Sequence, residues 1–300
     1  MSADALIPGF ADRTARLTAG QIAYSIAGEG PPVLLLHGYP QSRACWREVA
    51  PSLAAKFTVV APDLRGYGDS AKPASDPEHL TYAKRAMAAD MAELMAHLGF
   101  GRFAVAGHDR GGRVAYRLAL DHPQSVKRLA VLDIATTLDT FDRTGKFMAL
   151  GTYHWFFLAQ PFDLPERLIG AEPEFYLRWT LKSWAAPGFR FDDKAMAHYL
   201  KAFSDPAARH AMCEDYRAGA TRDCENDAAD RAAGTRIAAP VLCLWGERRN
   251  KDGRDFDYLG FWRPWAHEVR GRALDCGHFL PEERPEEVAD ELARFFGAAD

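Results

Sequence analysis

The sequence predicts an α/β fold in which a mostly parallel sheet is covered by helices and carries an inserted helical lobe. Three observations support it. Apolar, strand-like runs alternate with helical runs from about residue 21 to residue 132. After about residue 138 the strand signals stop and aromatic-rich helical segments follow, and near residue 240 a strand signal returns. Continuous apolar strands separated by helices are typical of parallel sheets buried on both faces.

The elements follow in order along the chain. We expect strands at residues 21–27, 33–36, 57–61, 103–106, 126–132 and 240–246. We expect helices from 46 to 53, 82 to 98, 112 to 120 and 285 to 296, and helical segments in the lobe at 154–157, 176–184 and 196–216. This pattern divides the chain into a core domain, residues 1–138 and 233–300, and a helical cap domain, residues 139–232.

Length, charge and composition limit the class of protein. Three hundred residues with 48% hydrophobic content suffice for one large α/β domain with an inserted lobe, or for two ordinary domains. A net charge of −4 with interspersed signs gives no extended basic field, so neither nucleic acid nor an anionic membrane surface is an expected partner. The N-terminus lacks a targeting signal, and no run approaches the ~18 apolar residues of a membrane span. We therefore expect a soluble, cytoplasmic protein.

Cysteine and histidine usage gives no sign of a disulfide framework or a metal site. The five cysteines are odd in number, and none forms a C-x-x-C pair. None of the ten histidines forms an H-E-x-x-H pattern or a similar ligand cluster. No metal and no other cofactor is expected.

A carboxylate stands where a nucleophile is expected. Asp109 lies two positions from both Gly107 and Gly111, as the serine does in the Gly-x-Ser-x-Gly elbow, and it falls between a predicted strand and a predicted helix. The start of a helix favours an anion, so Asp109 should be ionised. A carboxylate that attacks carbon forms an ester, which a base-activated water must then hydrolyse. The alternative is that Asp109 only caps the helix, a role in which Asp is common.

Further motifs accompany this elbow. They are His37-Gly38, Asp63-Leu64-Arg65-Gly66-Tyr67-Gly68-Asp69-Ser70, His154-Trp155, Cys213-Glu214-Asp215-Tyr216-Arg217 and Gly277-His278-Phe279-Leu280-Pro281-Glu282-Glu283. Together with the elbow and Arg113, they resemble the fluoroacetate (haloacetate) dehalogenases of the α/β-hydrolase superfamily. The resemblance extends from end to end of the chain and implies an α/β-hydrolase fold.

The candidate base is His278, which follows the last part of the predicted sheet and could lie over Asp109 to deprotonate water. The superfamily often carries the acid that orients this histidine three residues after the glycine that ends a late strand, but that position holds Arg249 here. We choose Asp133, at the end of the strand 126–132, and keep Glu247 and Asp252 as weaker candidates.

Two arginines suggest an anionic substrate. Arg110 and Arg113 lie one and four residues past the nucleophile, where both guanidinium groups could reach the site. Planar guanidinium groups bind a carboxylate through two parallel hydrogen bonds, so the pair would hold the carboxylate of a haloacid. The alternative, two solvated helix arginines, is more common for Arg113 than for Arg110.

The resemblance also implies donors for the leaving halide and for the oxyanion. His154, Trp155 and Tyr216 match the family at the halide-binding positions, although each alone could be a packing residue. The backbone N–H groups of Tyr39 and Arg110 would form the oxyanion hole. Trp184 could line the pocket or merely pack.

The sequence therefore predicts a cofactor-independent haloacetate dehalogenase that converts fluoroacetate to glycolate and fluoride through an ester on Asp109, and the resemblance suggests a homodimer. An epoxide hydrolase is the nearest alternative and would need lobe tyrosines to protonate the epoxide oxygen; Tyr153, Tyr176, Tyr199 and Tyr216 are available. A small-molecule receptor without catalysis is the third.

Overall fold

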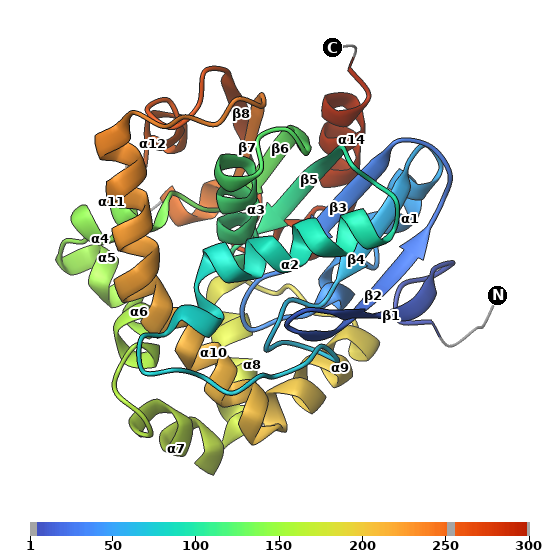
Figure 1. Ribbon diagram of the computed structural model, residues 1–300. Helices are drawn as coiled ribbons and strands as arrows, with labels where there is room; N and C mark the ends of the chain where they lie inside the picture. Colours follow the sequence, from blue (N-terminus) through green and yellow to red (C-terminus); the bar gives the residue numbers. More distant parts are fainter. Residues whose placement is uncertain (1–4, 251–255, 299–300) are drawn as a thin grey trace.

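The computed structural model describes residues 5–250 and 256–298, and it is built on one eight-stranded sheet (Figure 1). The strand order is β1-β2-β4-β3-β5-β6-β7-β8. β1 and β2 run antiparallel to their neighbours, and all other pairs are parallel. The strands are β1 (Ala11–Leu17), β2 (Gly20–Ala27), β3 (Pro32–Leu36), β4 (Thr58–Pro62), β5 (Phe103–His108), β6 (Val126–Leu132), β7 (Val241–Gly246) and β8 (Val269–Leu274).

Helices pack against this sheet in two pairs. α2 and α3 pack against each other and lie in front of the strands in Figure 1, and α1 packs against α14. α3 also contacts β5 and β6, the two strands that carry Asp109 and Asp133 at their ends. The helical elements outside the inserted lobe are η1 (Arg43–Trp46), α1 (Ala50–Ala54), η2 (Leu80–Tyr82), α2 (Lys84–His97), α3 (Arg110–Asp121), η4 (Glu247–Asn250), α12 (Tyr258–Trp262), α13 (Leu280–Glu283) and α14 (Pro285–Phe296).

The segment between β6 and β7 is mostly helical, and its one β contact among the described residues is an isolated parallel bridge between Ile237 and Ala266. Its helices gather at the lower and left side of the molecule in Figure 1, and α10 contacts α6, α7 and α9. They are α4 (Thr137–Asp142), α5 (Lys146–Gly151), α6 (Tyr153–Leu158), α7 (Leu164–Ala171), α8 (Pro173–Trp184), α9 (Asp193–Ser204), α10 (Pro206–Ala218), the π-helical turn η3 (Gly219–Asp223) and α11 (Cys224–Ala233). We call this segment the cap. The predicted fold class is confirmed.

Several elements differ from those expected. β1 and β8 were not predicted because both are edge strands that carry arginines on exposed positions and therefore lack an apolar run. The expected helix 196–216 is two helices, because Pro206 cannot continue a helix and the Asp205 carboxylate caps the second one through the N–H of Ala207. In place of the expected helix 46–53, η1 ends at Trp46 and α1 begins at Ala50.

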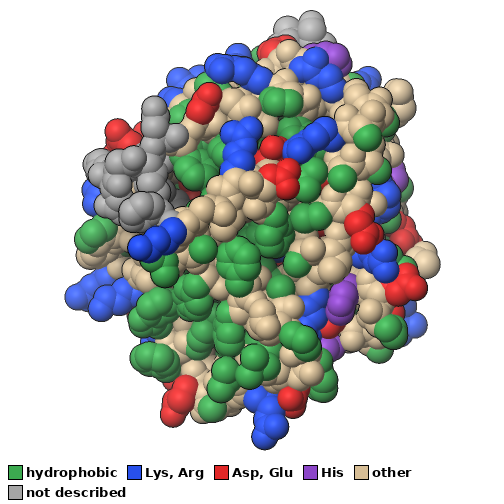
Figure 2. Space-filling view, turned by 90° about the vertical axis from the view of Figure 1, so that its left-hand side faces the viewer, with side chains coloured by type: hydrophobic (Ala, Val, Ile, Leu, Met, Phe, Trp, Pro, Cys, Tyr) green, Lys and Arg blue, Asp and Glu red, His purple; other side chains and the backbone are tan. Residues whose placement is uncertain are grey.

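Several large apolar side chains of the cap are exposed. Figure 2 shows apolar side chains gathered on the face that lies on the left in Figure 1. The exposed large apolar side chains of the cap, which we call the cap apolar patch, are Leu150, Phe156, Phe162, Leu164, Leu168, Phe175 and Trp179. Among the described residues, no helix is both long and apolar enough to cross a bilayer.

Candidate active site

Asp109 occupies a sharp turn between β5 and α3. Its backbone has φ +48° and ψ −120°, a conformation that non-glycine residues rarely adopt. A Cβ at Gly107 would lie 2.3 Å from the carbonyl oxygen of Gly111, and one at Gly111 would lie 2.2 Å from that of His37. The flanking glycines are therefore required by close packing of the turn. The Asp109 side chain makes no capping hydrogen bond to α3, so the alternative of a simple helix cap is wrong.

The turn after β3 approaches this carboxylate from the other side. Tyr39 donates its backbone N–H to Asp109 Oδ1 at 2.9 Å. A Cβ at Gly38 would lie 2.4 Å from the Asp109 Cβ, so only glycine permits this approach. Buried His37 holds the turn: its Nε2 accepts the Leu64 N–H at 3.0 Å, which leaves Nδ1 to donate to the Gly38 carbonyl at 3.0 Å.

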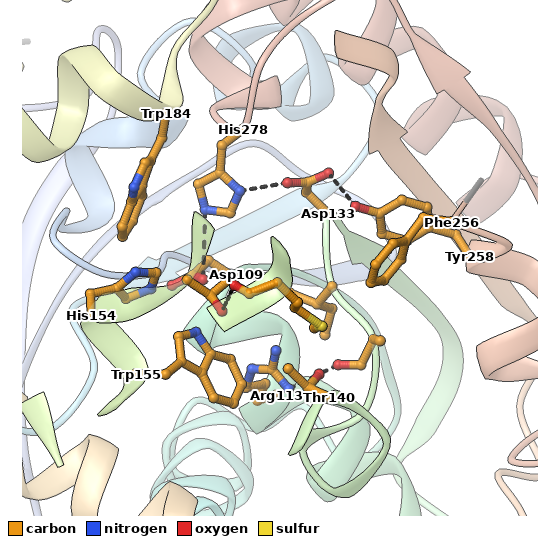
Figure 3. A pocket seen from close by; sticks show the side chains of 14 residues that line it. Asp109, Arg113, Asp133, Thr140, His154, Trp155, Trp184, Phe256, Tyr258 and His278 are labelled. Atoms are coloured by element: carbon orange, nitrogen blue, oxygen red, sulfur yellow. Dashed lines mark hydrogen bonds and ion pairs between the residues drawn. The ribbon is translucent and has the colours of Figure 1, made fainter. Parts of the chain in front are cut away.

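His278 lies between two carboxylates (Figure 3). Its Nδ1 is 2.6 Å from Asp133 Oδ2, and its Nε2 is 3.6 Å from Asp109 Oδ2. Asp133 Oδ1 accepts the Gly246 N–H at 3.0 Å and the Tyr258 hydroxyl at 3.3 Å. Of the acids considered from the sequence, Asp133 is the one that contacts His278, and Asp252 lies outside the described residues. No contact joins Glu247 to His278 in the described part of the chain.

His108, next to the nucleophile, was not assigned a role from the sequence. Its Nε2 donates to the His278 carbonyl oxygen at 2.7 Å, and the two rings are 4.6 Å apart. Burial, with a contribution from His278, lowers the pKa of His108 to about 4. His108 is therefore neutral at physiological pH and acts as a fixed donor that locates the His278 backbone. Its place inside the elbow motif was the available signal.

The charge state of Asp109 suits nucleophilic attack. Burial alone would raise its pKa, but the hydrogen bond and charge of His278, together with His108 and Arg110, hold the pKa of Asp109 well below its ordinary value. Asp109 is thus a carboxylate at neutral pH. Its Oδ1 is occupied by the Tyr39 N–H, so Oδ2 is the oxygen available to attack.

A cavity of about 90 Å³ lies in front of Asp109. This is far smaller than the roughly 300–1,000 Å³ of sites for drug-sized ligands, so it suits a small molecule. In Figure 3, His154 and Trp184 lie on one side of Asp109, and Phe256 and Tyr258 on the other. The lining residues are Asp109, Arg113, Asp133, Ile134, Ala135, Thr140, Met148, Thr152, His154, Trp155, Trp184, Phe256, Tyr258 and His278.

The two arginines have different surroundings. Arg113 lines the cavity, and its guanidinium lies 4.3 Å from the Trp155 ring centre. Its Nη1 donates to the Ala135 carbonyl at 2.8 Å and to Thr137 Oγ1 at 3.3 Å. No carboxylate of the residues that the structure describes forms an ion pair with it. Arg113 is thus a buried cation without a carboxylate partner at the cavity wall.

Arg110 does not line the cavity. Its Nη2 and Nε donate to the Asp215 carboxylate at 2.6 and 3.1 Å. Asp215 also accepts the Tyr67 hydroxyl at 2.7 Å and forms an ion pair with Lys84. Arg110 Nη1 has no hydrogen-bond partner within the described chain. The two arginines expected to act together are therefore separated: one is neutralised by Asp215, and the other faces the cavity.

The three expected halide donors lie close together, but they do not all line the cavity. His154 and Trp155 line it, and Tyr216 packs edge-on against both, with ring centres 5.7 and 6.1 Å away. The buried Tyr216 hydroxyl has no hydrogen-bond partner in the described residues. Burial and the charge of Asp109 raise the pKa of Tyr216, as expected for a hydroxyl close to that carboxylate. The Trp184 ring lies 4.3 Å from that of His154 and also lines the cavity.

The remaining lining residues could not be identified from the sequence. They come from three separated segments and carry no recognisable motif: Ile134, Ala135, Thr140, Met148, Thr152, Phe256 and Tyr258. Ile134 and Ala135 directly follow Asp133, and position after the strand was the only local signal for them.

Glu282, in the turn of helix after His278, joins the core to the cap. Its carboxyl group accepts the Tyr199 hydroxyl at 3.0 Å and hydrogen-bonds to Gln41. Burial raises the pKa of Glu282 to about 8. An acid whose folded pKa exceeds its unfolded value of about 4.3 stabilises the fold below that value, and this stabilisation is lost as the pH rises through the folded pKa.

We therefore expect the Glu282→Gln variant to change the pH dependence of stability. Between about pH 5 and 9 the melting temperature of the wild type should fall relative to that of the variant, because glutamine has no proton to lose. Thermal unfolding followed by circular dichroism at several pH values measures this. Parallel curves for the two proteins would contradict the expectation.

The chain is similar to known α/β hydrolases over nearly its whole length. A family model described as alpha/beta hydrolase fold matches residues 31–285. A fluoroacetate dehalogenase from Burkholderia sp. is 43% identical over 98% of this chain and 96% of its own. A soluble epoxide hydrolase from Corynebacterium sp. (strain C12) is 38% identical over 94% of this chain and 96% of its own. The crystal structure of an α/β hydrolase from Nostoc sp. PCC 7120 superposes with a TM-score of 0.94 at 52% identity, covering 97% of this chain and 99% of its own.

Proposed function

Because the chain belongs to the haloacetate dehalogenase family of the α/β-hydrolase superfamily, we propose that it cleaves the carbon–halogen bond of haloacetates, converting fluoroacetate to glycolate and fluoride. The observation that carries the proposal is Arg113, a buried cation with no ion-pair partner among the described residues, on the wall of a small cavity beside Asp109. A buried charge without a partner is costly, and a substrate carboxylate would offset that cost.

In the first step, Arg113 holds the carboxylate of the haloacetate, so that the adjacent carbon faces Asp109. Asp109 Oδ2 attacks this carbon, the new C–O bond forms, and the halide leaves with the electron pair of the C–X bond. His154, Trp155 and Tyr216 are the proposed N–H and O–H donors to the departing halide. The unpartnered Tyr216 hydroxyl supports this role.

In the second step, His278 takes a proton from water, and the resulting hydroxide attacks the Asp109 carbonyl carbon. Asp133 orients the ring through Nδ1 and stabilises the imidazolium. The Tyr39 N–H already bonds Oδ1, where the negative charge develops, and the N–H of Arg110 is the proposed second donor. Losing one such donor typically costs about 2.7–4 kcal/mol of activation free energy. The ester bond then breaks, and glycolate oxygen takes the proton from His278.

The test is halide release, measured with ion-selective electrodes, from fluoroacetate, chloroacetate and chloroacetamide. The amide is the matched neutral control for chloroacetate. Halide from both acids and little from the amide supports the proposal. Chloride without fluoride would keep the dehalogenase activity and withdraw the fluoride role of His154, Trp155 and Tyr216. No halide from either acid would overturn the proposal.

Arg113→Gln should weaken haloacetate binding specifically. A charge-assisted hydrogen bond contributes about 1.5–3 kcal/mol, so we expect KM for chloroacetate to rise on the order of tenfold to hundredfold. Steady-state kinetics measures this, and the low rate of halide release from chloroacetamide should not change. Arg113→Lys keeps the charge but loses the planar guanidinium group, so its KM for chloroacetate should lie between those of the wild type and Arg113→Gln. An unchanged KM in Arg113→Gln would assign the carboxylate to another group.

The second candidate function is epoxide hydrolysis, favoured by one observation. The hydroxyl of Tyr216 has no hydrogen-bond partner among the described residues, and the charge of Asp109 acts on it, so it could protonate the oxygen of an opening epoxide. Tyr199, another tyrosine considered, instead donates to Glu282. With Arg113 at the wall, an epoxide that carries a carboxylate would fit better than a neutral one.

Glycidate and the neutral glycidol separate these two epoxide classes. Formation of glycerate from glycidate, lost in Tyr216→Phe, would support the second candidate, and no diol from either compound would exclude it. The third alternative, a receptor without catalysis, has no observation in its favour, because nucleophile, histidine and acid lie in contact.

A homodimer, suggested by the family, is part of the proposal. The cap apolar patch and the apolar side chains gathered on one face in Figure 2 support it, because exposed apolar surface commonly marks an interface. Light scattering coupled to size exclusion should give twice the chain mass, and Phe175→Glu with Leu168→Glu should reduce it to one.

A further inference from the structure

We propose that Glu283 is a positioning residue for His278 and that it ties the placement of this histidine to the docking of the cap. The inference rests on the proposed two-step function only for its kinetic test. Glu283 is the last residue of α13 and lies five positions after His278. Neither the sequence motifs nor the chemistry of the cavity assigns it a role.

The carboxylate of Glu283 accepts three backbone N–H groups. Oε1 accepts the N–H of Phe279 at 2.9 Å, and Oε2 accepts that of Gly277 at 2.8 Å. These two residues flank His278 on either side. Oε2 also accepts the N–H of Ala186 at 2.9 Å. Only the Phe279 bond lies at the start of α13, so stabilising that short helix does not explain the other two.

Ala186 belongs to the cap, in the segment that leaves α8. In the same segment, the Trp184 carbonyl oxygen accepts the N–H of His278 at 2.9 Å. A Cβ at Gly277 would lie 2.5 Å from the Trp184 oxygen and 2.6 Å from the Ala186 nitrogen, so the two segments pack without spare room. The His278 loop and cap residues 184–186 thus form one hydrogen-bonded unit with Glu283 at its centre.

This unit reaches the cavity through Trp184. Its ring centre lies 4.3 Å from that of His154 and 5.4 Å from that of His278, and all three side chains line the cavity (Figure 3). Movement of cap residues 184–186 would therefore shift the Trp184 wall of the cavity and the His278 loop together. Glu283 makes no contact with the cavity and acts through the backbone on both sides of His278.

A carboxylate suits this position because it only accepts hydrogen bonds. Three N–H groups point at two oxygens, and no cation of the described residues forms an ion pair with Glu283. In glutamine, one of the two oxygens becomes an NH₂ group, which cannot accept from the N–H that faces it. The isosteric Glu283→Gln change therefore removes at least one of the three bonds while conserving volume.

The test compares Glu283→Gln with Glu282→Gln, the neighbouring glutamate with the same substitution and a contact of its own to the cap. The first readout is rapid-quench kinetics with chloroacetate, followed by intact-protein mass. We expect Glu283→Gln to slow hydrolysis of the Asp109 ester at least tenfold more than it slows the first chloride burst, and therefore to accumulate that ester. Glu282→Gln should show neither effect.

The second readout does not depend on the substrate. In protein labelled with ¹⁵N-histidine, the Nδ1–H proton of His278, bonded to Asp133, should give a downfield resonance that shifts or broadens in Glu283→Gln and not in Glu282→Gln. If the wild type releases no halide, the proposed function fails and this resonance still decides the positioning role.

The inference is overturned if the His278 resonance of Glu283→Gln is the same as that of the wild type. An equal loss of both chemical steps with an unchanged resonance also overturns it. If Glu283→Gln does not fold, Glu283→Asp, which keeps the charge on a shorter side chain, replaces it with the same expected directions.

Discussion

The Asp109→Asn variant is expected to release no detectable halide from chloroacetate or fluoroacetate, a loss on the order of 10⁴-fold or more. The reason is chemical, because a neutral amide oxygen is a far weaker nucleophile than a carboxylate. The change is also nearly isosteric, so the Tyr39 N–H keeps an acceptor on this side chain. Ion-selective electrodes measure the release.

Two controls make this result interpretable. The melting temperature of Asp109→Asn should stay close to that of the wild type, since the amide can keep the hydrogen bond of Oδ1. Intact-protein mass after incubation verifies that the amide has not hydrolysed back to the carboxylate. Halide release at the wild-type rate from a verified variant would show that Asp109 is not the nucleophile.

The His278→Ala variant is expected to carry out the first step and stop at the second. Halide displacement needs no proton transfer, whereas ester hydrolysis loses its base. One equivalent of halide per active site should therefore appear in a burst without turnover. Intact-protein mass should show the substrate-derived adduct, and peptide mapping should place it on Asp109.

A matched comparison is Asp133→Asn, which leaves the ring in place but removes the charge that holds it. We expect slowed turnover with partial accumulation of the adduct, since the orienting group contributes less than the base itself. Sustained turnover in His278→Ala, or the absence of any adduct, would argue against the two-step scheme.

The sequence predicts some elements of the fold and of the site and not others. The strands β3 to β7 were predictable because buried parallel strands are apolar throughout. The helix α14 was predictable because apolar residues recur along an amphipathic helix with the helical period. The elbow at Asp109 was predictable because its glycines are demanded by local backbone geometry. The edge strands β1 and β8 were not, since their exposed faces carry charges.

Motifs in the sequence limited which residues could belong to the site. They did not determine how those residues are arranged in space. Asp133 was preferred over Glu247 from the sequence, yet the contact with His278 depends on β6 lying between β5 and β7. The sequence treats Arg110 and Arg113 alike as two arginines at the start of one helix. Asp215, 105 residues later in the chain, accepts the guanidinium of Arg110 and leaves Arg113 at the cavity.

By itself, therefore, the sequence determined the fold class, the strained turn and the residue types that could serve as nucleophile, base and anion anchor, because periodicity, glycine placement and side-chain chemistry are local properties. The tertiary structure showed which acid contacts His278, which arginine has no ion-pair partner among the described residues, and that Glu283 joins the loop around His278 to the cap. Each of these depends on hydrogen bonds or ion pairs between segments distant in the chain or on backbone groups brought together by folding, and neither burial nor pairing can be read from a residue's neighbours in sequence.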